Sequence, residues 1–343
     1  IDHPGNSDKG QKAMKKMNKH MASEKFASYF MLLALALTFL VFGLINPAYL
    51  SATNILDILR TASIIGIIGI GGSFVMSTGE TNFAVGTQAT LAAAITGLIM
   101  MRVPDRFYWI ALIVPIAVLA LVGAVMAIAV NKLRMSSFLC TLTLEMILTG
   151  FIRFVTRNAV MYSSDWGPNF TLLGQTNIGG VLPVPVIVFL GVALLAHIYK
   201  EKTRWGRYNF AVGANAVTAR QVGINVEWEK IKGFMICGAF TGVAGIVLVS
   251  MFANVNMTMG TYYKFPGICA TVLSAAFWKI GRYNVPGSII GAVLIVAIQN
   301  GVIAIGGDYY FKEIVQGALL LISLLIVAGI REDGLPKVSF TSD

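Results

Sequence analysis

GRYNFAVGANAVTARQVGINVEWEKIK, residues 206–232, is the only sizeable polar stretch in the interior of a chain otherwise made of long apolar runs. The runs on either side of it are long enough to cross a bilayer. In a multi-spanning chain, one long cytoplasmic loop that carries its own short helix is expected to hand a signal or a force to something in the cytosol. We call residues 206–232 the island, and it gives the best clue to function.

Composition places the chain in a membrane. Of 343 residues, 56% are hydrophobic and 12% are charged, whereas soluble domains carry about 25% charged residues. The net charge of +10 does not indicate nucleic-acid binding, because the basic residues sit at the ends of apolar segments, as orientation in a membrane requires. The sequence therefore excludes a soluble domain and predicts an all-α integral membrane protein.

The apolar runs predict about ten transmembrane helices, since a span needs ~20 mostly apolar residues. The third follows a polar break and the eighth is short for a full crossing, so either of these two can be re-entrant or broken. We expect the spans at residues 26–44, 55–78, 83–101, 109–131, 136–155, 181–199, 232–251, 265–279, 285–305 and 313–330.

Charge asymmetry predicts the orientation. Of the 26 Lys and Arg residues, 19 fall in segments on the same side as the N-terminus and 7 in segments on the other side, which is the bias expected when both termini are cytoplasmic. We expect a basic arm at 1–25, a transmembrane domain at 26–330 with a cytoplasmic loop at 200–232, and a tail at 331–343. Because Ile1 is not an initiator residue, residues 1–13 are left out of the functional argument.

Small residues at helical spacing predict close packing, because lipid tails offer no hydrophobic drive between helices. Two readings are open, namely ordinary packing within one bundle and a specific seam between two copies. The positions are Ser63, Gly66, Gly69 and Gly72 in the second span, and the GxxxG pairs Gly238/Gly242 and Gly287/Gly291 in the seventh and ninth.

A carboxylate in the fifth span predicts a polar translocation path, because charges inside spans are costly and usually functional. Glu145 lies midway along this span, and Thr141 and Thr149 lie four residues away on the same helical face. The alternative is a set of interhelical hydrogen bonds without a transport role.

Two further polar groups are expected to line the same path. Glu80 and Asn82 interrupt the apolar run before the third span, and such a break is tolerated only where it is buried in protein or lines a watery cavity. Gln299 and Asn300 lie late in the ninth span. The alternative is a hydrogen-bonded turn at 80–82 and interhelical bonds for the amides.

The chain carries no catalytic motif. There is no GxxxxGK[ST] phosphate loop, no HExxH and no nucleophile elbow. The three histidines have no metal-ligand spacing, and the three scattered cysteines read as small apolar core residues. We therefore expect a transport subunit rather than an enzyme, with no catalytic residue, no cofactor and no metal.

The island predicts a short helix with its own caps. Asn215 suits the N-cap, Ala216–Val222 can form two turns, and Gly223 suits the position after the helix. So short a helix is marginal alone and needs a neighbour. The alternative is an interfacial loop lying on the membrane. The face toward the neighbour would comprise Ala216, Ala219, Arg220 and Gly223.

The island resembles the cytoplasmic coupling loop of ribose-type ABC transporter permeases, a carbohydrate-uptake family also called branched-chain-type. The family reads approximately GRxxxAIGGNxxAARxSGIxVxxxK there, and the resemblance extends over about residues 30–330. Residues 137–142, 281–291 and 300–301 are similar to its PSFIVTL, GGRGSxxGxxxG and NNG runs. The matching island positions are Gly206, Arg207, Ala211, Gly213, Asn215, Ala219, Arg220, Gly223, Ile224, Val226 and Lys232.

The chain departs from the family pattern in two places. The family's TGGIDLSVG appears here as residues 78–86, with Asn82 in place of the acid and a new acid at Glu80, and its LGGTS appears as 273–277 without glycines. Glu145 has no expected counterpart. These departures bear on the substrate more than on the architecture, and they would suit one half of a permease made from two different chains.

The resemblance implies a permease subunit of an ATP-driven importer for a sugar or sugar-like solute in the bacterial inner membrane. Its partners would be ABC ATPase subunits, a second permease subunit that is identical or homologous, an extracytoplasmic solute-binding protein and membrane lipid, with no nucleic acid. The ATPase would act through the 215–223 helix. The coupling residues that it implies are Gly206, Arg207, Gly213, Asn215, Ala219, Arg220 and Gly223.

The outer loop 156–180, with Asp165 and Trp166, is expected to dock the binding protein, and the alternative is a solvated connection. Within the same transporter class, uptake of nucleosides or amino acids is the second reading. An ion-driven secondary transporter would use Glu145 and Glu80 as proton carriers, but it leaves the island unexplained. A passive channel lacks any selectivity-filter-like sequence.

Overall fold

The computed structural model describes residues 31–103, 105–162, 166, 170, 174–179, 182–308 and 310–332. The expected basic arm and residues 333–343 lie outside them. The described part of the chain is almost entirely helical, in agreement with the all-α prediction. Its α-helices are Met31–Ile45, α2 (Ala52–Met76), α3 (Val85–Met100), α4 (Tyr108–Leu133), α5 (Ser137–Thr156), α7 (Val184–Lys202), α8 (Arg204–Ala214), α9 (Ala216–Gln221), α10 (Val226–Phe252), α11 (Lys264–Ser274), α12 (Val285–Ala304) and α13 (Phe311–Glu332).

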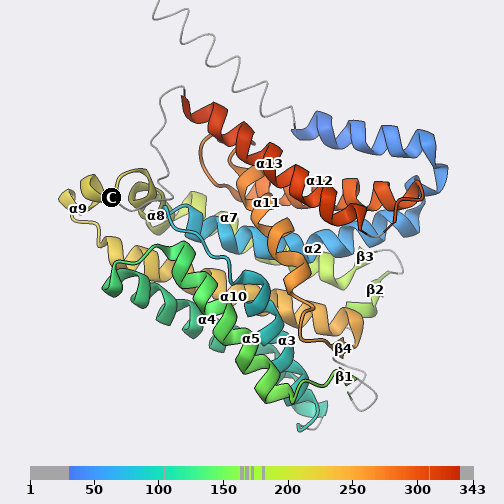
Figure 1. The fold of residues 1–343 in the computed structure, drawn as a ribbon, viewed down its shortest axis with the longest axis horizontal. Coiled ribbons are helices and arrows are strands. Elements are labelled where there is room, and N and C mark those ends of the chain that lie inside the picture. Colours follow the sequence, from blue (N-terminus) through green and yellow to red (C-terminus); the bar gives the residue numbers. More distant parts are fainter. Residues whose placement is uncertain are drawn as a thin grey trace, which may run out of the picture.

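Short elements connect these helices. Three 3₁₀ turns are η1 (Pro47–Leu50), η2 (Asp105–Phe107) and η4 (Thr261–Tyr263). Strand β1 (Met161–Tyr162) pairs antiparallel with β4 (Asn254–Val255), and β2 (Asn177–Ile178) pairs with β3 (Leu182–Pro183). Figure 1 shows both strand pairs at one end of the molecule and α8 and α9 at the other. We call these the opposite end and the island end.

Six helices of the described residues are long and apolar enough to cross a membrane, namely α2, α4, α5, α7, α10 and α12. Their outer faces expose large apolar side chains such as Leu121, Phe154 and Leu195, which are 62%, 81% and 68% exposed. Water would disfavour such faces, whereas lipid accommodates them. The chain is a multi-pass membrane protein, but ten continuous spanning helices are not confirmed.

The third and eighth expected spans are broken. The 16 residues of α3 extend ~24 Å and the 11 residues of α11 extend ~16 Å, both less than the ~30 Å hydrocarbon core. The non-helical segment 77–84 leads from α2 into α3, and β4 and η4 lead into α11. The expected bounds 83–101 and 265–279 are therefore corrected to a helix that begins at Val85 and one that ends at Ser274.

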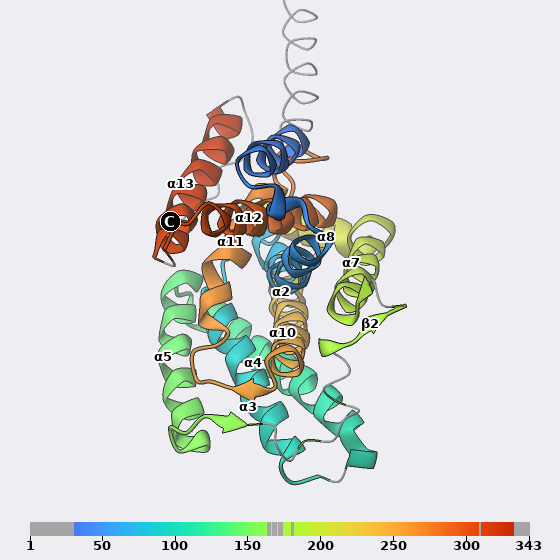
Figure 2. The same ribbon diagram turned by 90° about the vertical axis from the view of Figure 1, so that its right-hand side faces the viewer.

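Helix α10 lies at the centre of the bundle and packs most extensively on α4, α3 and α2. Figure 2 shows it between α5 on one side and α7 on the other. The backbones approach closely, because a Cβ atom on Gly238 would lie 2.1 Å from the carbonyl oxygen of Leu119 in α4. A Cβ on Gly287 of α12 would similarly lie 2.6 Å from Ser274 Cα in α11. Both GxxxG pairs therefore serve packing within one chain.

Candidate functional site

The two broken spans meet inside the bundle. A Cβ atom on Gly260, just before η4, would lie 2.3 Å from the carbonyl oxygen of Gly86, and one on Gly86 would lie 2.9 Å from the carbonyl oxygen of Gly260. The Gly260 amide also donates to Thr90 Oγ1 at 3.0 Å. Only residues without a side chain allow this approach. We call the region formed by residues 82–90, Glu145 and 260–264 the crossing.

Buried amides hold the entry into α3 at the crossing. Asn82, which is 5% exposed, accepts from the Ala84 amide at 3.0 Å and donates to Gln88 Oε1 at 3.1 Å. Asn82 thus forms the hydrogen-bonded turn that the sequence left open as an alternative. Gln88 is fully buried, and its Nε2 has no hydrogen-bond partner in the described structure. A buried donor without a partner is costly. The Gln88 amide therefore leaves one hydrogen-bond donor at the crossing that a ligand could use.

Glu145 lies at the crossing and forms an ion pair there. Its Oε1 accepts from Lys264 Nζ at 2.8 Å and from Thr87 Oγ1 at 3.4 Å. The two charged side chains are 17% and 12% exposed, so each would be costly without the other. Thr141 accepts from the Phe83 amide at 3.2 Å, so the helical face predicted around Glu145 does meet the start of α3.

Glu80 lies at the island rather than at the crossing. Its carboxylate pairs with Lys230 of α10 at 2.5 Å, with the side chains 16% and 22% exposed. The expectation grouped Glu80 with Glu145 in one path; in the structure each carboxylate pairs with a different lysine, Lys230 of α10 for Glu80 and Lys264 for Glu145. Segment 77–84 joins the island and the crossing.

Gln299 and Asn300 have different surroundings on α12. Gln299 is 6% exposed and lines a cavity of about 80 Å³ with Tyr262, Pro266 and Gln316, between α12, α13 and the η4–α11 segment. Asn300, the next residue, is half-buried and does not line it. The cavity lies beside the short helix α11, and a role of either amide in a translocation path stays a prediction.

The island is more ordered than one short helix in a loop. Helix α8 begins directly after Thr203, whose side chain accepts from the Gly206 amide at 3.3 Å. Asn215 ends α8 and caps α9, where Oδ1 accepts from the Thr218 amide at 3.0 Å. Gly223 has φ +83° and closes α9, as the sequence predicted. The expected loop 200–232 is therefore corrected to the end of α7, two helices and the first turns of α10.

Two glycines of the expected coupling set fix the island to the membrane helices. A Cβ on Gly213 would lie 2.2 Å from the carbonyl oxygen of Ser77, and one on Gly206 would lie 2.2 Å from that of Lys200. Asn209 is 3% exposed and donates to the carbonyl oxygen of Phe74 at 3.2 Å. Helix α8 thus packs rigidly on the ends of α2 and α7.

Helix α9 presents an apolar surface that the sequence did not assign. Ala219 is buried against Val212 and Val226 of its own chain, whereas Val217 and Val222 are 69% and 70% exposed. Ala219 therefore does not share one exposed surface with the rest of the predicted face, whose contact with a neighbour stays a prediction. The other three of its residues, Ala216, Arg220 and Gly223, are exposed.

The expected docking loop is only partly described. Asp165 lies outside the described residues. Trp166 is 6% exposed and packs edge-on against Phe170, so little of its own side chain is accessible, and docking of the binding protein at this loop stays a prediction.

Sequence reasoning missed Lys230, Lys264 and Gly260. The two lysines were counted only for orientation, although a lysine at the start of an apolar run is the natural partner for a carboxylate at membrane depth. The chain has 35 glycines, and no local pattern distinguishes Gly260 from the others as a site of close backbone contact.

Comparison with known proteins agrees with this architecture. Residues 54–324 match the family described as branched-chain amino acid transport system / permease component. The chain is 30% identical over 297 residues to the ribose import permease of Escherichia coli K12, which covers 86% of this chain and 92% of that protein.

Two further relatives are a D-allose transport system permease of the same organism, 26% identical with 88% and 91% coverage, and the fructose import permease of Rhizobium meliloti, 26% identical with 88% and 85% coverage. The family match covers most of the chain. It contains the six candidate membrane-crossing helices, apart from the first two residues of α2. The chain therefore belongs to the family of branched-chain amino acid transport system permease components.

Proposed function

We propose that this chain is the permease subunit of an ATP-driven importer for a sugar, in which the island transmits force from a separate ABC ATPase to the crossing. One observation carries the proposal. The island contacts segment 77–84 at two points, since Gly213 packs against Ser77 and Lys230 pairs with Glu80. Because segment 77–84 runs from these contacts to Asn82 at the crossing, a displacement of the island must move the polar site.

Helix α9 supplies the contact for the ATPase. Its two exposed valines lie on a helix fixed at both ends by Asn215 and Gly223, and an exposed apolar surface on a rigid element is typical of a protein interface. The ATPase closes on nucleotide binding, and the permease needs two packings of similar free energy to respond. The short helices α3 and α11, each entered through a non-helical or 3₁₀ segment, are suited to such a rearrangement.

A sugar is favoured by the chemistry of the crossing and by the relatives. Thr87, Thr90 and the Gln88 amide offer neutral hydrogen-bonding groups, while the charges of Glu145 and Lys264 neutralise each other. Once exposed by a rearrangement of the crossing, such groups would suit hydroxyl groups better than a zwitterion. The relatives named above are ribose, D-allose and fructose permeases.

The orientation follows from the coupling. We place both termini and the island in the cytoplasm, in keeping with the charge bias, and the opposite end outside, where a solute-binding protein docks. A second permease subunit, identical or homologous, completes the membrane part. The whole assembly lies in the bacterial inner membrane.

The coupling role is tested with Val217→Asp in the reconstituted transporter. The charge should keep the ATPase from seating, so uptake falls at least tenfold while the thermal unfolding midpoint of the permease stays within about 2 °C, since an exposed substitution changes stability by less than ~0.5 kcal/mol. Val217→Ile is the conservative control and should transport normally. Full transport by Val217→Asp would remove α9 from the coupling route.

The energy source and solute class are tested in the same preparation. An ATPase partner inactivated by substitution should abolish uptake, whereas collapse of the ion gradients should not. Labelled pentoses and hexoses, nucleosides and branched-chain amino acids are then compared. Saturable uptake of an amino acid or a nucleoside but no sugar would replace the sugar assignment with the alternative, and gradient-driven uptake without ATP would overturn the importer.

A further inference from the structure

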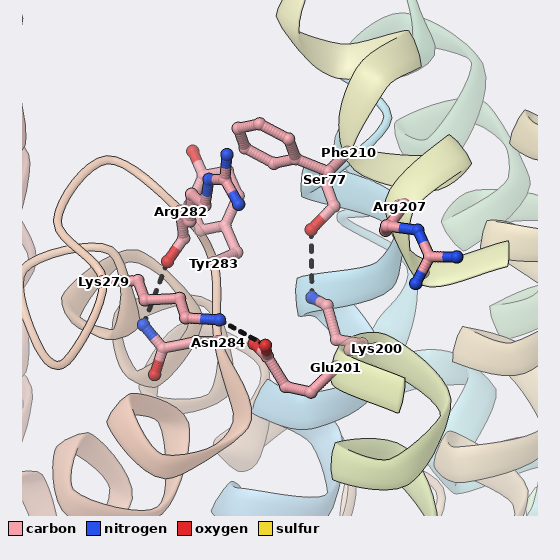
Figure 3. Close-up of a pocket in the computed structure, with 10 residues that line it drawn as sticks. Ser77, Lys200, Glu201, Arg207, Phe210, Lys279, Arg282, Tyr283 and Asn284 are labelled. Atoms are coloured by element: carbon pink, nitrogen blue, oxygen red, sulfur yellow. Dashed lines mark hydrogen bonds and ion pairs between the residues drawn. The ribbon is translucent and has the colours of Figure 1, made fainter. Parts of the chain in front are cut away.

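A pocket of about 370 Å³ lies at the island end, between the α7–α8 corner and the loop that joins α11 to α12. Figure 3 shows its lining, with α7 and α8 on one side and the loop 279–284 on the other. Cationic side chains dominate it, and one carboxylate is present. The charged lining residues are Lys200, Glu201, Arg207, Lys279 and Arg282.

The single carboxylate does not neutralise this pocket. Glu201 pairs with Lys279 (Figure 3). Lys200 donates only to neutral oxygens, which are the carbonyl and Oγ of Ser73 at 3.0 and 3.1 Å and Oγ of Ser77 at 2.9 Å. Its three N–H groups are therefore taken up by neutral acceptors.

The guanidinium of Arg282 is likewise held by a neutral group. Its Cζ lies 4.0 Å from the centre of the Phe210 ring, which fixes the plane of the guanidinium by a cation–π contact and leaves its N–H groups for a ligand. Arg207, on the facing helix, forms no hydrogen bond or ion pair with the described residues. Two arginines and a lysine with no carboxylate partner thus line one pocket.

The loop that carries Arg282 is preorganised. Asn284 is 2% exposed, and its Nδ2 lies 2.6 Å from the carbonyl oxygens of Ser274 and Phe277 and 3.0 Å from that of Arg282. Because the loop is fixed by these bonds, ordering it on ligand binding costs little. A surface arginine on a mobile loop would lack this advantage.

A second hollow adjoins the pocket and is apolar at its edge. Its volume is about 360 Å³, and it is lined by Trp278, Lys279, Ile280 and Arg282. Trp278 is 60% exposed, and tryptophan is enriched where protein meets the headgroup layer of a membrane. The two hollows share Lys279 and Arg282.

We propose that this pocket binds a phosphate group, with Arg282 as its principal cationic contact. Planar guanidinium donors match phosphate oxygens well, and basic pockets between membrane helices on the cytoplasmic side hold anionic lipid headgroups. The phosphate comes either from such a lipid or from a soluble phosphate. The bound anion would join α8 of the island to the loop after the broken eighth span. The binding itself does not depend on the proposed transport function.

The test uses the full-length chain in nanodiscs. One arm raises the fraction of phosphatidylglycerol in phosphatidylcholine discs, and the other adds inorganic phosphate to discs of phosphatidylcholine alone. The apparent dissociation constant is taken from the rise in the thermal unfolding midpoint with ligand concentration. Wild type is compared with Arg282→Gln, with Arg282→Lys and with Arg204→Gln, in which an exposed arginine of α8 outside the pocket is neutralised.

We expect Arg282→Gln to weaken binding about tenfold or more, since hydrogen bonds to charged groups contribute ~1.5–3 kcal/mol. Arg282→Lys should bind with intermediate affinity, and Arg204→Gln should bind as wild type does. Stabilisation in the first arm alone assigns the site to a lipid headgroup, and stabilisation in the second assigns it to a soluble phosphate.

Three results would overturn the proposal. They are an absence of stabilisation in both arms, an equal loss in Arg282→Gln and Arg204→Gln, and loss of binding once the ATPase is assembled on the wild-type chain. The last would mean that the partner protein fills the pocket.

Discussion

The crossing and the island each contain a lysine–glutamate pair that joins distant parts of the chain, yet the two regions are built differently. At the crossing, Lys264 meets Glu145 among backbones that touch at Gly86 and Gly260. At the island, Lys230 meets Glu80 beside helices that carry their own caps and leave apolar side chains outside. The crossing depends on the close packing of backbones that are distant in sequence. The island depends on helix caps within a few residues, and its exposed apolar side chains are free to contact a partner.

The largest effect should come from the backbone contact at the crossing. In Gly260→Ala the new methyl group would lie 2.3 Å from the Gly86 carbonyl oxygen, so two backbones must separate. We expect more than ~3 kcal/mol of destabilisation, beyond the usual range for overpacking, and complete loss of uptake. Gly150→Ala is the control, because no atom lies within 4 Å of its Cβ position. Normal uptake by Gly260→Ala would mean that the broken spans do not meet as described.

The second effect concerns the ion pair at the crossing. Glu145→Gln leaves the Lys264 ammonium without its partner at 12% exposure, which should cost about 3 kcal/mol, the lower end for buried pairs. Thermal unfolding and uptake are measured together. The reversed pair, Glu145→Lys with Lys264→Glu, should recover part of the lost stability. Equal stability of wild type and Glu145→Gln would show that the pair is not formed.

The island pair should have a smaller effect on stability and a selective effect on transport. Glu80→Gln removes a charged hydrogen bond worth about 1.5 kcal/mol and frees segment 77–84 from α10. We expect ATP hydrolysis by the assembled transporter to persist while uptake falls severalfold. A parallel loss of hydrolysis and uptake, with the unfolding midpoint unchanged, would contradict the separation of the two regions.

The smallest effect is expected at the surface of α9. Arg220 and Glu227 lie 3.8 Å apart with both side chains about 70% exposed, and such pairs contribute ~0.2–1 kcal/mol or less. Arg220→Gln should leave the unfolding midpoint within about 2 °C of wild type. A larger shift would indicate that α9 depends on this pair and not on Ala219. Any loss of uptake at unchanged stability would then point to a contact with the ATPase.

Much of the island could be predicted from sequence because its signals are local. Asn215 and Gly223 act on backbone groups within a few residues, so their capping roles can be predicted without knowing the fold. The direction of Ala219 could not be predicted, because it depends on Val212 and Val226 across a small cluster. The helix α8 was missed since its residues read as polar loop.

The interior was predicted less well. The polar break and the short apolar run allowed the third and eighth spans to be re-entrant or broken, without deciding between these possibilities and a full crossing. The sequence did not predict that Glu80 and Glu145 have different lysine partners, or that Gln299 lines a cavity and Asn300 does not. Nor did it predict that Trp166 is buried. Each of these points concerns which distant residue a side chain meets.

Three features were determined by the sequence alone: the membrane location of the chain, the position of the polar island and the capping of its short helix. Hydropathy and capping can be read locally, because they act over one span or one turn. Tertiary structure alone decided that the two broken spans touch at Gly86 and Gly260, and that Glu80 and Glu145 each pair with a distant lysine. The physical reason is that desolvated charges and touching backbones need partners more than a hundred residues away, and no local pattern specifies which ones.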